Sequence, residues 1–333
     1  MRRRAFLQAA GSAAIAWPIR AQAQKDTKLP LWAAEPKVYR MAACKFSPLF
    51  WASFLDGLHQ LGYVEGKNLI IDRCADENPA HYEEIVREMV QGKPDVIAVG
   101  VDSQLISQVA KAANPIPVVA VLPSVAAGLV HDIARPEGNI TGIIADAGIE
   151  MQGKHLDLLR QAIPSIKRVA YLSNRRDWEG PWGKAILEAG RASGITIIGV
   201  SLELSAEEPE YRAAFETMVQ QSADALVFNG LPPNFSHREL IADLALKYRL
   251  PSICWFLEVV ENGHGLLSYA PDYSIWPMQV AQCVDQLLKG TKVADIPVTQ
   301  PTKFILAVNL KTAKALGLQM SPSLIAQADK VVE

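Results

Sequence analysis

Apolar residues recur along the chain with two periods, one typical of helices and one typical of strands. Over residues 50–61 they fall on a single helical face, and after a turn at Gly62 the short, β-branched run 68–75 has the character of a strand. The uninterrupted apolar run 95–100 indicates a strand that is covered on both faces of a sheet. Helical and strand-like segments alternate in this way along most of the chain.

Turn residues divide the chain into elements of ordinary length. Strands are expected over 37–46, 68–75, 95–100, 116–122, 139–145, 168–174, 195–202, 225–230, 251–256, 265–270 and 303–309. Helices are expected over 50–61, 81–92, 103–113, 124–133, 150–162, 182–193, 208–221, 237–249 and 273–289, with a short helix after 309. Strands that alternate with helices form parallel sheets with right-handed crossovers.

The alternation restarts after residue 145, which predicts an α/β fold of two doubly wound, Rossmann-like lobes with parallel sheets. Open parallel sheets bind ligands beyond the carboxyl ends of their strands. In a protein with two such lobes, both sets of strand ends can face one ligand cleft. The turn at Gly62 lies at the amino end of a strand and therefore belongs to the scaffold.

The first 36 residues have the pattern of an export signal and a tether. Residues 1–23 combine a basic start, a short apolar stretch and the cleavage pattern Ala21-Gln22-Ala23, and Arg3-Arg4-Ala5-Phe6-Leu7 is typical of twin-arginine signals. An ordinary Sec signal is the alternative. Residues 24–36 are polar and interrupted by proline, so we expect a tether and an exported, periplasmic protein that begins near Gln24.

Composition argues against several classes of protein. A net charge of −2 over 333 residues disfavours a nucleic-acid-binding protein, which normally has a basic face. Nucleotide-binding, α/β-hydrolase and zinc-protease motifs are absent from the sequence, so no cofactor, metal or enzymatic activity is expected. The four cysteines are too few and too dispersed for a disulfide scaffold. Cys44 and Cys74 lie in neighbouring predicted strands and can pair, but buried free thiols are the favoured interpretation.

Candidate ligand-binding residues stand at or just beyond the ends of predicted strands. They are Phe46, Ser47, Val101, Asp102, Ser103 and Ser124 in the first lobe, and Asn174, Asp177, Trp178, Asn229, Gly230, Trp255, Phe256, Glu258 and Tyr269 in the second. Serine and asparagine side chains, with N–H groups at helix starts, suit a carboxylate or another anion. Asp102 and Glu258 suit an ammonium group. Alternatively, Asp102, Ser103 and Ser124 are only helix N-caps.

Aromatic residues at the strand ends suggest how a planar ligand is held. Trp255 and Phe256 are consecutive, so we expect their side chains to point in opposite directions, with one approaching the cleft. That residue, together with Trp178, is expected to stack on a planar ligand group. In the alternative, the pair at 255–256 is core and Trp178 lies in a surface loop. Three further aromatic residues are expected in the core: Trp51, Phe54 and Trp276.

Several segments resemble one protein family, in order and over essentially the whole chain that follows the signal. They are LGYVEGKNLIID (61–72), ARPEGNITGI (134–143), KHLDLLRQAIPSIKRVAYLSN (154–174), FSHRELIADLALKYRLPSICWF (235–256), LLSYAPDY (266–273) and QPTKFILAVNLKTAKALGLQMSPSLIAQADKVVE (300–333). They resemble the ABC-transporter substrate-binding proteins of the tryptophan-binding type. The resemblance implies a type I periplasmic binding fold with three crossovers between two lobes, a ligand between the lobes, and closure that is sensed by a membrane permease.

The chain departs from the family pattern at three strand ends. Pro123-Ser124 stands where the family usually has Asp-Pro, Leu257 where an arginine is frequent, and Ala270 where a glycine follows the Ser-Tyr pair. These positions lie on the ligand side of the strands. They therefore bear on the identity of the ligand and leave the expected fold unchanged.

These observations lead to one expected organisation and one expected function. The first lobe is expected to span 37–145 plus about 271–298, and the second 146–270 plus about 299–333, with hinges near 144–147, 270–272 and 297–302. The expected function is that of a monomeric periplasmic protein that delivers an amino acid, aromatic or branched, or a related carboxylate to the permease of an ABC importer by hinge closure. An exported enzyme or a ligand-sensing protein on the same architecture is the alternative.

Overall fold

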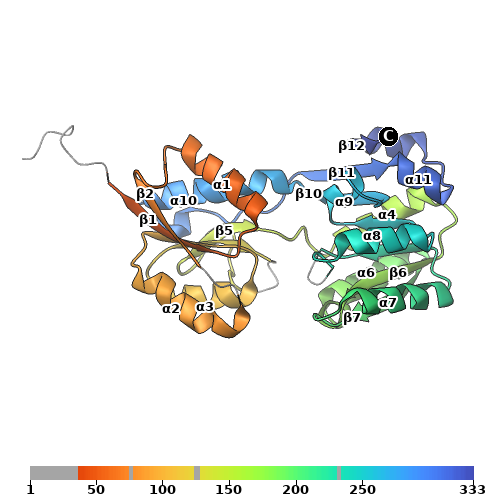
Figure 1. Cartoon of the computed structure of the whole chain (residues 1–333), viewed down its shortest axis with the longest axis horizontal. Helices are drawn as coiled ribbons and strands as arrows, with labels where there is room; N and C mark the ends of the chain where they lie inside the picture. The colour runs from red at the N-terminus through yellow and green to blue at the C-terminus, as the bar shows by residue number, and fades with distance from the viewer. Residues whose placement is uncertain (1–36, 75–77, 124–127, 231–233) are drawn as a thin grey trace, which may run out of the picture. The chain divides into compact units, whose positions relative to one another are not determined.

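A parallel sheet of five strands organises the first part of the chain. The computed structural model describes residues 37–74, 78–123, 128–230 and 234–333 (Figure 1). The strands of this sheet are β1 (Tyr39–Cys44), β2 (Leu69–Arg73), β3 (Val96–Val99), β4 (Val118–Leu122) and β5 (Ile140–Ile144). They lie in the order β2-β1-β3-β4-β5, and every neighbouring pair is parallel. This sheet agrees with the predicted doubly wound arrangement.

Helices cover both faces of the first sheet, as its continuous apolar strands require. They are α1 (Pro48–Gln60), the short η2 (Pro79–His81), α2 (Tyr82–Gln91), α3 (Ser103–Ala113) and α10 (Trp276–Leu288). Helices α1 and α10 contribute to one buried cluster and α2 and α3 to the other, each pair on its own face of the strands (Figure 1). Phe54 is fully buried in the first cluster, and Trp51 and Trp276 pack against it, which confirms the core role expected of these three residues.

A seven-stranded sheet organises the second part. Its strands are β6 (Arg168–Asn174), β7 (Thr196–Leu202), β8 (Ala225–Phe228), β9 (Ser252–Cys254), β10 (Leu267–Pro271), β11 (Phe304–Asn309) and β12 (Lys330–Val332). They lie in the order β12-β11-β10-β9-β8-β6-β7. The pairs from β7 to β10 are parallel, which agrees with the sequence prediction. The two-lobed α/β fold is thereby confirmed.

The helices of the second sheet pack into two further clusters, one on each face. They are α4 (Met151–Ala162), α5 (Arg175–Glu179), α6 (Pro181–Ser193), α7 (Glu208–Gln220), α8 (Arg238–Lys247), α9 (Leu257–Glu261), α11 (Leu310–Leu316) and α12 (Pro322–Gln327), with η4 (Tyr273–Ile275) and η5 (Val293–Asp295) outside this set. Helices α7, α8 and α9 cover one face, and α4, α6, α11 and α12 cover the other (Figure 1).

Strand β11 runs antiparallel to β10, which differs from the expected all-parallel sheet. The cause is the path of the chain: it leaves β10 at Pro271, forms α10 on the first sheet, and returns beside the point of departure. There the N–H of Asp272 donates to the carbonyl of Lys303 at 2.9 Å, and the two side chains form an ion pair at 2.8 Å. A strand that begins where its neighbour ends must run in the opposite direction. Strand β12, which the sequence did not predict, pairs parallel with β11.

Two other sequence expectations need correction. The helix expected over 124–133 is absent from residues 128–133, which form bends, and residues 124–127 lie outside the described part of the chain. The interpretation of all cysteines as free thiols is wrong for Cys44 and Cys74, which form a disulfide. These two residues stand at the carboxyl ends of adjacent parallel strands, where the N–H of Cys74 also donates to Ala43 at 3.1 Å. Cys254 and Cys283 are buried and free, as expected.

We expect the disulfide to stabilise the fold appreciably. It joins residues 30 positions apart, and a cross-link of this span restricts the unfolded chain by about 3 kcal/mol. A dithiol reductant should therefore lower the melting temperature of the wild type. The Cys44→Ser/Cys74→Ser variant should melt earlier than the oxidised wild type and should not respond to the reductant. An equal response of both proteins would show that the disulfide contributes nothing.

Candidate functional site

The carboxyl ends of the parallel strands collect most of the predicted ligand-binding residues. Phe46 and Ser47 follow β1, and Val101, Asp102 and Ser103 follow β3. On the second sheet, the corresponding residues are Asn174 at the end of β6, Asp177 and Trp178 after it, Asn229 and Gly230 after β8, and Trp255, Phe256 and Glu258 after β9, with Tyr269 inside β10. Ser124 lies outside the described residues. Parallel strands thus bring residues that are distant in sequence to one edge of each sheet.

At the edge of the first sheet, polar residues begin two helices. The Ser47 hydroxyl accepts from the N–H of Phe50 at 3.3 Å at the start of α1, and Asp102 accepts from Leu105 at 2.8 Å at the start of α3. The other Asp102 carboxylate oxygen accepts from the Tyr82 hydroxyl. These contacts agree with the capping interpretation of Asp102, and they show that Ser47, which was not expected to be a cap, also begins a helix. They also mean that the Asp102 carboxylate already has neutral donors on both oxygens.

Phe46 packs within an aromatic cluster of the first sheet. Its ring stacks on Phe50 with 4.6 Å between centroids and meets the edge of Trp51 at 5.5 Å, and only 8% of the residue is exposed. This packing accounts for Phe46 without a ligand. Val101, in contrast, is 48% exposed in the loop that follows β3. Contact of either residue with a ligand stays a prediction.

At the edge of the second sheet, three predicted residues form one hydrogen-bonded group. Asn174 ends β6 and accepts from the N–H of Asp177 at 2.9 Å, which places the Asp177 side chain back over the strand end. The Oδ2 atom of Asp177 accepts from Asn174 Nδ2 at 3.0 Å and from Asn229 Nδ2 at 2.8 Å. Two neighbouring strands, β6 and β8, therefore hold one carboxylate between two amides.

The Asp177 carboxylate is half-buried and carries no compensating cation in direct contact. Burial raises the pKa of the Asp177 carboxyl, while Asn229, Arg176 and Asn174 act in the opposite direction. Within the described part of the chain, Asp177 forms no ion pair and its Oδ1 atom has no hydrogen-bond partner. A partly desolvated carboxylate with one unused oxygen is suited to accept hydrogen bonds from an ammonium group.

The hydrogen-bonded group around Asp177 extends into the second lobe through Asn234 and Tyr211, which the sequence alone did not single out. Asn234 donates to the Oδ1 atom of Asn229 at 2.9 Å, and its own Oδ1 accepts from the Tyr211 hydroxyl at 3.1 Å. Asn234 and Tyr211 are almost completely buried. The sequence offers little signal for Asn234, because an asparagine after Pro232-Pro233 resembles an ordinary turn residue.

Glu258 differs from Asp177 in having a cationic partner. Its Oε1 atom lies 3.1 Å from Nε of Arg238, and both side chains are partly exposed. On sequence alone, Asp102 and Glu258 are the residues expected to meet an ammonium group. Since the former is bonded by Tyr82 and the latter is paired with Arg238, Asp177 is the better acceptor among the three.

The aromatic residues of this edge divide among different clusters. Phe256 packs with Phe228 and Phe235, whereas Trp255 packs with Trp182 and His155, so the two consecutive side chains point apart as expected. Trp255 and Phe256 are both buried. The Trp178 ring belongs to a third cluster, where it packs on Gly199 and near Tyr171. Stacking of these residues on a ligand stays a prediction.

His155 and Tyr269 complete the surroundings of Trp255. The Nε2 atom of His155 lies 2.8 Å from the carbonyl oxygen of Tyr269, and burial lowers the pKa of His155 to about 4, so its imidazole is neutral. The Tyr269 ring stacks on Phe304 at 5.6 Å. At Gly230, a side chain would come within 3.3 Å of the Trp255 Cβ atom, so a small residue suits this position.

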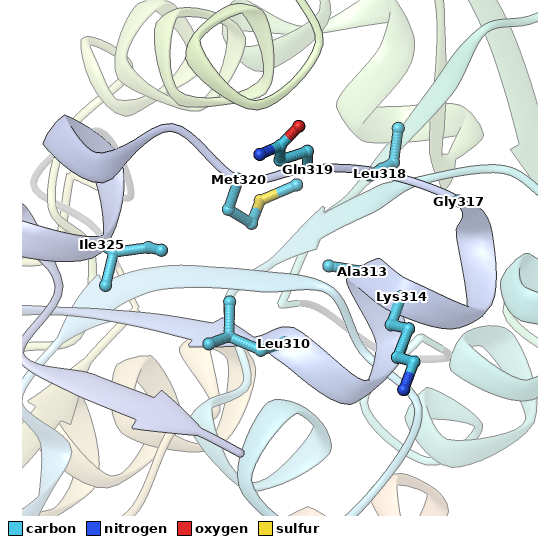
Figure 2. Close-up of a pocket in the computed structure, with 8 residues that line it drawn as sticks. All are labelled: Leu310, Ala313, Lys314, Gly317, Leu318, Gln319, Met320 and Ile325. Atoms are coloured by element: carbon cyan, nitrogen blue, oxygen red, sulfur yellow. The ribbon is translucent and has the colours of Figure 1, made fainter.

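A separate hollow of about 430 Å³ lies beside α11 (Figure 2). Leu310, Ala313, Met320 and Ile325 surround it, with Lys314 at its margin. Because β11 is antiparallel to β10, α11 follows the edge of the sheet opposite to Asp177. None of the predicted ligand-binding residues lines this hollow.

The residues that the structure describes contain neither a cluster of metal-ligating side chains nor a helix that could span a membrane. No group of three or more histidine, cysteine, aspartate or glutamate side chains in these residues is arranged to hold a metal ion. None of the helices found there has the length and apolar character needed to span a bilayer.

Known proteins resemble this chain in sequence and in fold. The family model for ABC transporter substrate binding proteins matches residues 50–332. A tyrosine-binding protein of Clostridioides difficile (strain R20291) is 24% identical over 272 residues, which are 80% of this chain and 76% of that protein.

Two solved structures share the fold over most of the chain. An ABC domain from Streptococcus pneumonia in complex with L-Trp has a TM-score of 0.76 and 20% identity, and the match covers 89% of this chain and 100% of that one. A conserved domain protein of Vibrio cholerae O1 biovar eltor has a TM-score of 0.74 and 22% identity, again over 89% and 100% of the two chains.

The packing of Trp178 on Gly199 gives a direct structural prediction. A Cβ atom at position 199 would lie well inside van der Waals contact with the Trp178 ring. Gly199→Ala should therefore destabilise the fold by about 1–3 kcal/mol, as overpacking does. Gly153→Ala is the matched control, since its Cβ would meet nothing nearer than 4.0 Å and the residue lies in α4. Denaturant unfolding that finds the two variants equally stable would contradict this packing.

Proposed function

The chain belongs to the family of ABC transporter substrate-binding proteins, and we propose that it binds a free amino acid, aromatic or branched, and delivers it to an ABC permease. A related carboxylate is the wider class. The proposal rests mainly on Asp177, whose half-buried carboxylate has an unused oxygen and no ion-pair partner in the described part of the chain. The α-ammonium group of an amino acid supplies the missing cation and donors.

The opposite end of the ligand is a carboxylate, and the first sheet offers groups that suit it. Helices α1 and α3 begin at the carboxyl edge of that sheet, with Ser47 and Ser103 at their first turns. Helix starts present unpaired N–H groups and the positive end of the helix dipole, which favour anions. A ligand with both charges therefore has complementary groups on the two lobes.

Two relatives support an amino acid as the ligand class. The relative from Clostridioides difficile is described as tyrosine-binding, and the structure from Streptococcus pneumonia contains L-Trp. Both ligands carry an α-ammonium group, an α-carboxylate and an aromatic side chain. In this chain, we propose that either Trp255 or Phe256, together with Trp178, lies nearest to such a side chain.

Delivery to a permease requires that ligand binding changes the conformation of the protein. We propose that the lobes close about the segments near 144–147, 270–272 and 297–302, so that the closed form contacts both ends of the ligand. A ligand shifts this equilibrium only by its difference in affinity for the two forms. The parallel bridge between Ile143 and Thr299 and the Asp272–Lys303 ion pair support rotation about short, well-tethered connections.

A location outside the cytoplasm is consistent with the disulfide bond of the protein. The Cys44–Cys74 disulfide is typical of proteins that fold in an oxidising compartment such as the periplasm. The signal pattern in residues 1–23 supports export by the twin-arginine or the Sec route. We propose a monomeric periplasmic protein whose membrane partner is the permease.

Replacement of Asp177 tests the proposed ligand class. Asp177→Asn keeps the shape of the side chain and removes its charge, so the affinity for L-tyrosine or L-tryptophan should fall about tenfold or more, as expected for a charged hydrogen bond. Glu258→Gln is the matched control, because Arg238 already pairs with Glu258. Isothermal titration should find the control within about twofold of the wild type. Equal affinities for the wild type and Asp177→Asn would remove Asp177 from the site.

Affinity should also depend on pH through Asp177. The carboxylate must be ionised to hold an ammonium group, and burial raises its pKa above the ordinary value. Binding should therefore weaken as pH falls through this raised pKa, at a higher pH than an exposed aspartate would produce. Titrations at a series of pH values should show this loss in the wild type and a flatter profile in Asp177→Asn. Identical profiles would contradict the assignment.

A further inference from the structure

A buried chain of side-chain amides reaches Asp177 from the interior of the second lobe. We propose that Asn234 is a positioning residue that orients the Asn229 amide toward Asp177, and that the site thereby selects ligands with an ammonium group over analogues that lack it. This inference rests on the proposed function of Asp177. Neither Asn234 nor Tyr211 touches the expected ligand position, since both are almost fully buried.

A backbone carbonyl group fixes which way the side-chain amides of Asn234 and Asn229 are oriented. The Leu172 carbonyl oxygen can only accept, so the Asn234 side chain must present its Nδ2 group there, at 3.0 Å. The same Nδ2 group donates to Oδ1 of Asn229 at 2.9 Å. Asn229 must then turn its own Nδ2 group the other way, toward Oδ2 of Asp177 at 2.8 Å. Each orientation therefore follows from the one before it.

Tyr211 supports the same orientation from the other side. Its hydroxyl donates to Oδ1 of Asn234 at 3.1 Å, and burial together with Glu207 raises the pKa of Tyr211 to about 12, so the hydroxyl keeps its proton. Tyr211 is fully buried, and Asn234 and Asn229 are 1% and 5% exposed. A reversed amide in this environment would leave buried donors and acceptors unpaired, which is costly.

As a consequence, one oxygen of the Asp177 carboxylate always has a hydrogen-bond donor. If Asn229 were reversed, its carbonyl oxygen would face the carboxylate and repel it. With Asn229 held by Asn234, Oδ2 of Asp177 is occupied by two amide donors and Oδ1 remains for the ligand. A neutral group at that position would lack the attraction to the carboxylate that an ammonium group has, and an anionic group would be repelled by it.

Paired titrations test the inference on the full mature protein. L-Tyrosine and 3-(4-hydroxyphenyl)propionate differ only in the ammonium group, and the ratio of their affinities measures selectivity for it. In Asn234→Ala, and more mildly in Tyr211→Phe, this ratio should fall about tenfold and a few-fold respectively, while the affinity for the propionate stays close to that of the wild type. Asn234→Asp, which cannot donate to Leu172, should behave as Asn234→Ala.

Asn309→Ala is the matched control. Asn309 is also buried in the second lobe and donates to a backbone carbonyl, that of Val260 at 3.0 Å, but it ends β11 and caps α11 and is not part of the Asp177 group. Its loss should destabilise the protein without changing the selectivity ratio. A ratio that is unchanged in Asn234→Ala and Tyr211→Phe, or that falls equally in Asn309→Ala, would overturn the inference.

A ligand-free measurement separates this inference from the proposed function. Carboxyl NMR of Asp177 should give a higher pKa in Asn234→Ala than in the wild type, because Asn229 no longer donates steadily, while Arg176 and Asn174 still lower the pKa of Asp177 in both proteins. A wild type that binds both ligands equally well would contradict the ammonium site itself. An Asp177 pKa that is the same in both proteins would contradict the role of Asn234, whatever the ligand.

Discussion

The candidate site is organised around the Asp177 carboxylate, which is partly withdrawn from water and has no cation against it among the residues that the structure describes. Desolvation raises the pKa of Asp177 and favours its neutral form, and the amide donors from Asn174 and Asn229 offset part of that effect. An ionised Asp177 with an unused oxygen is incomplete until a cationic donor arrives. The ammonium group of an amino acid completes it, which links the electrostatics of one residue to the class of ligand.

The architecture supplies the positions that this chemistry needs. Asn174 and Asn229 are 55 residues apart in the chain, but they follow adjacent parallel strands and meet at one edge of the sheet. The core beneath them is rigid because apolar clusters cover both faces of that sheet. A precise amide geometry can therefore be maintained at a strand end, where the side chains also reach the ligand.

Much of this arrangement follows from the sequence, for a physical reason. Alternating periodicity predicted most of the strands and the longer helices of both lobes, because burial imposes a period of two on strands and of 3.6 on helices. The strand-end rule then singled out Asn174, Asp177 and Asn229, which the structure brings together. Antiparallel β11 escaped prediction because its direction depends on where the chain returns after α10, and local periodicity does not encode that path.

Other features depend on contacts that no local pattern reveals. The disulfide required the register of β1 and β2, and the choice between Asp177 and Glu258 required knowledge that Arg238 pairs with the latter. Asn234 looks like a turn residue until its three partners are seen in space. Trp178 was assigned to a ligand clamp on its position alone, whereas the absent side chain of Gly199 provides the space for its ring.

A crystal structure of the protein with L-tyrosine bound would locate the ligand nitrogen relative to Asp177. We expect this nitrogen to lie about 2.7–2.9 Å from Oδ1 of Asp177, the length of a charged hydrogen bond, with Oδ2 still held by Asn174 and Asn229. A ligand nitrogen bound instead by Asp102 or Glu258, with only water at Oδ1 of Asp177, would contradict it.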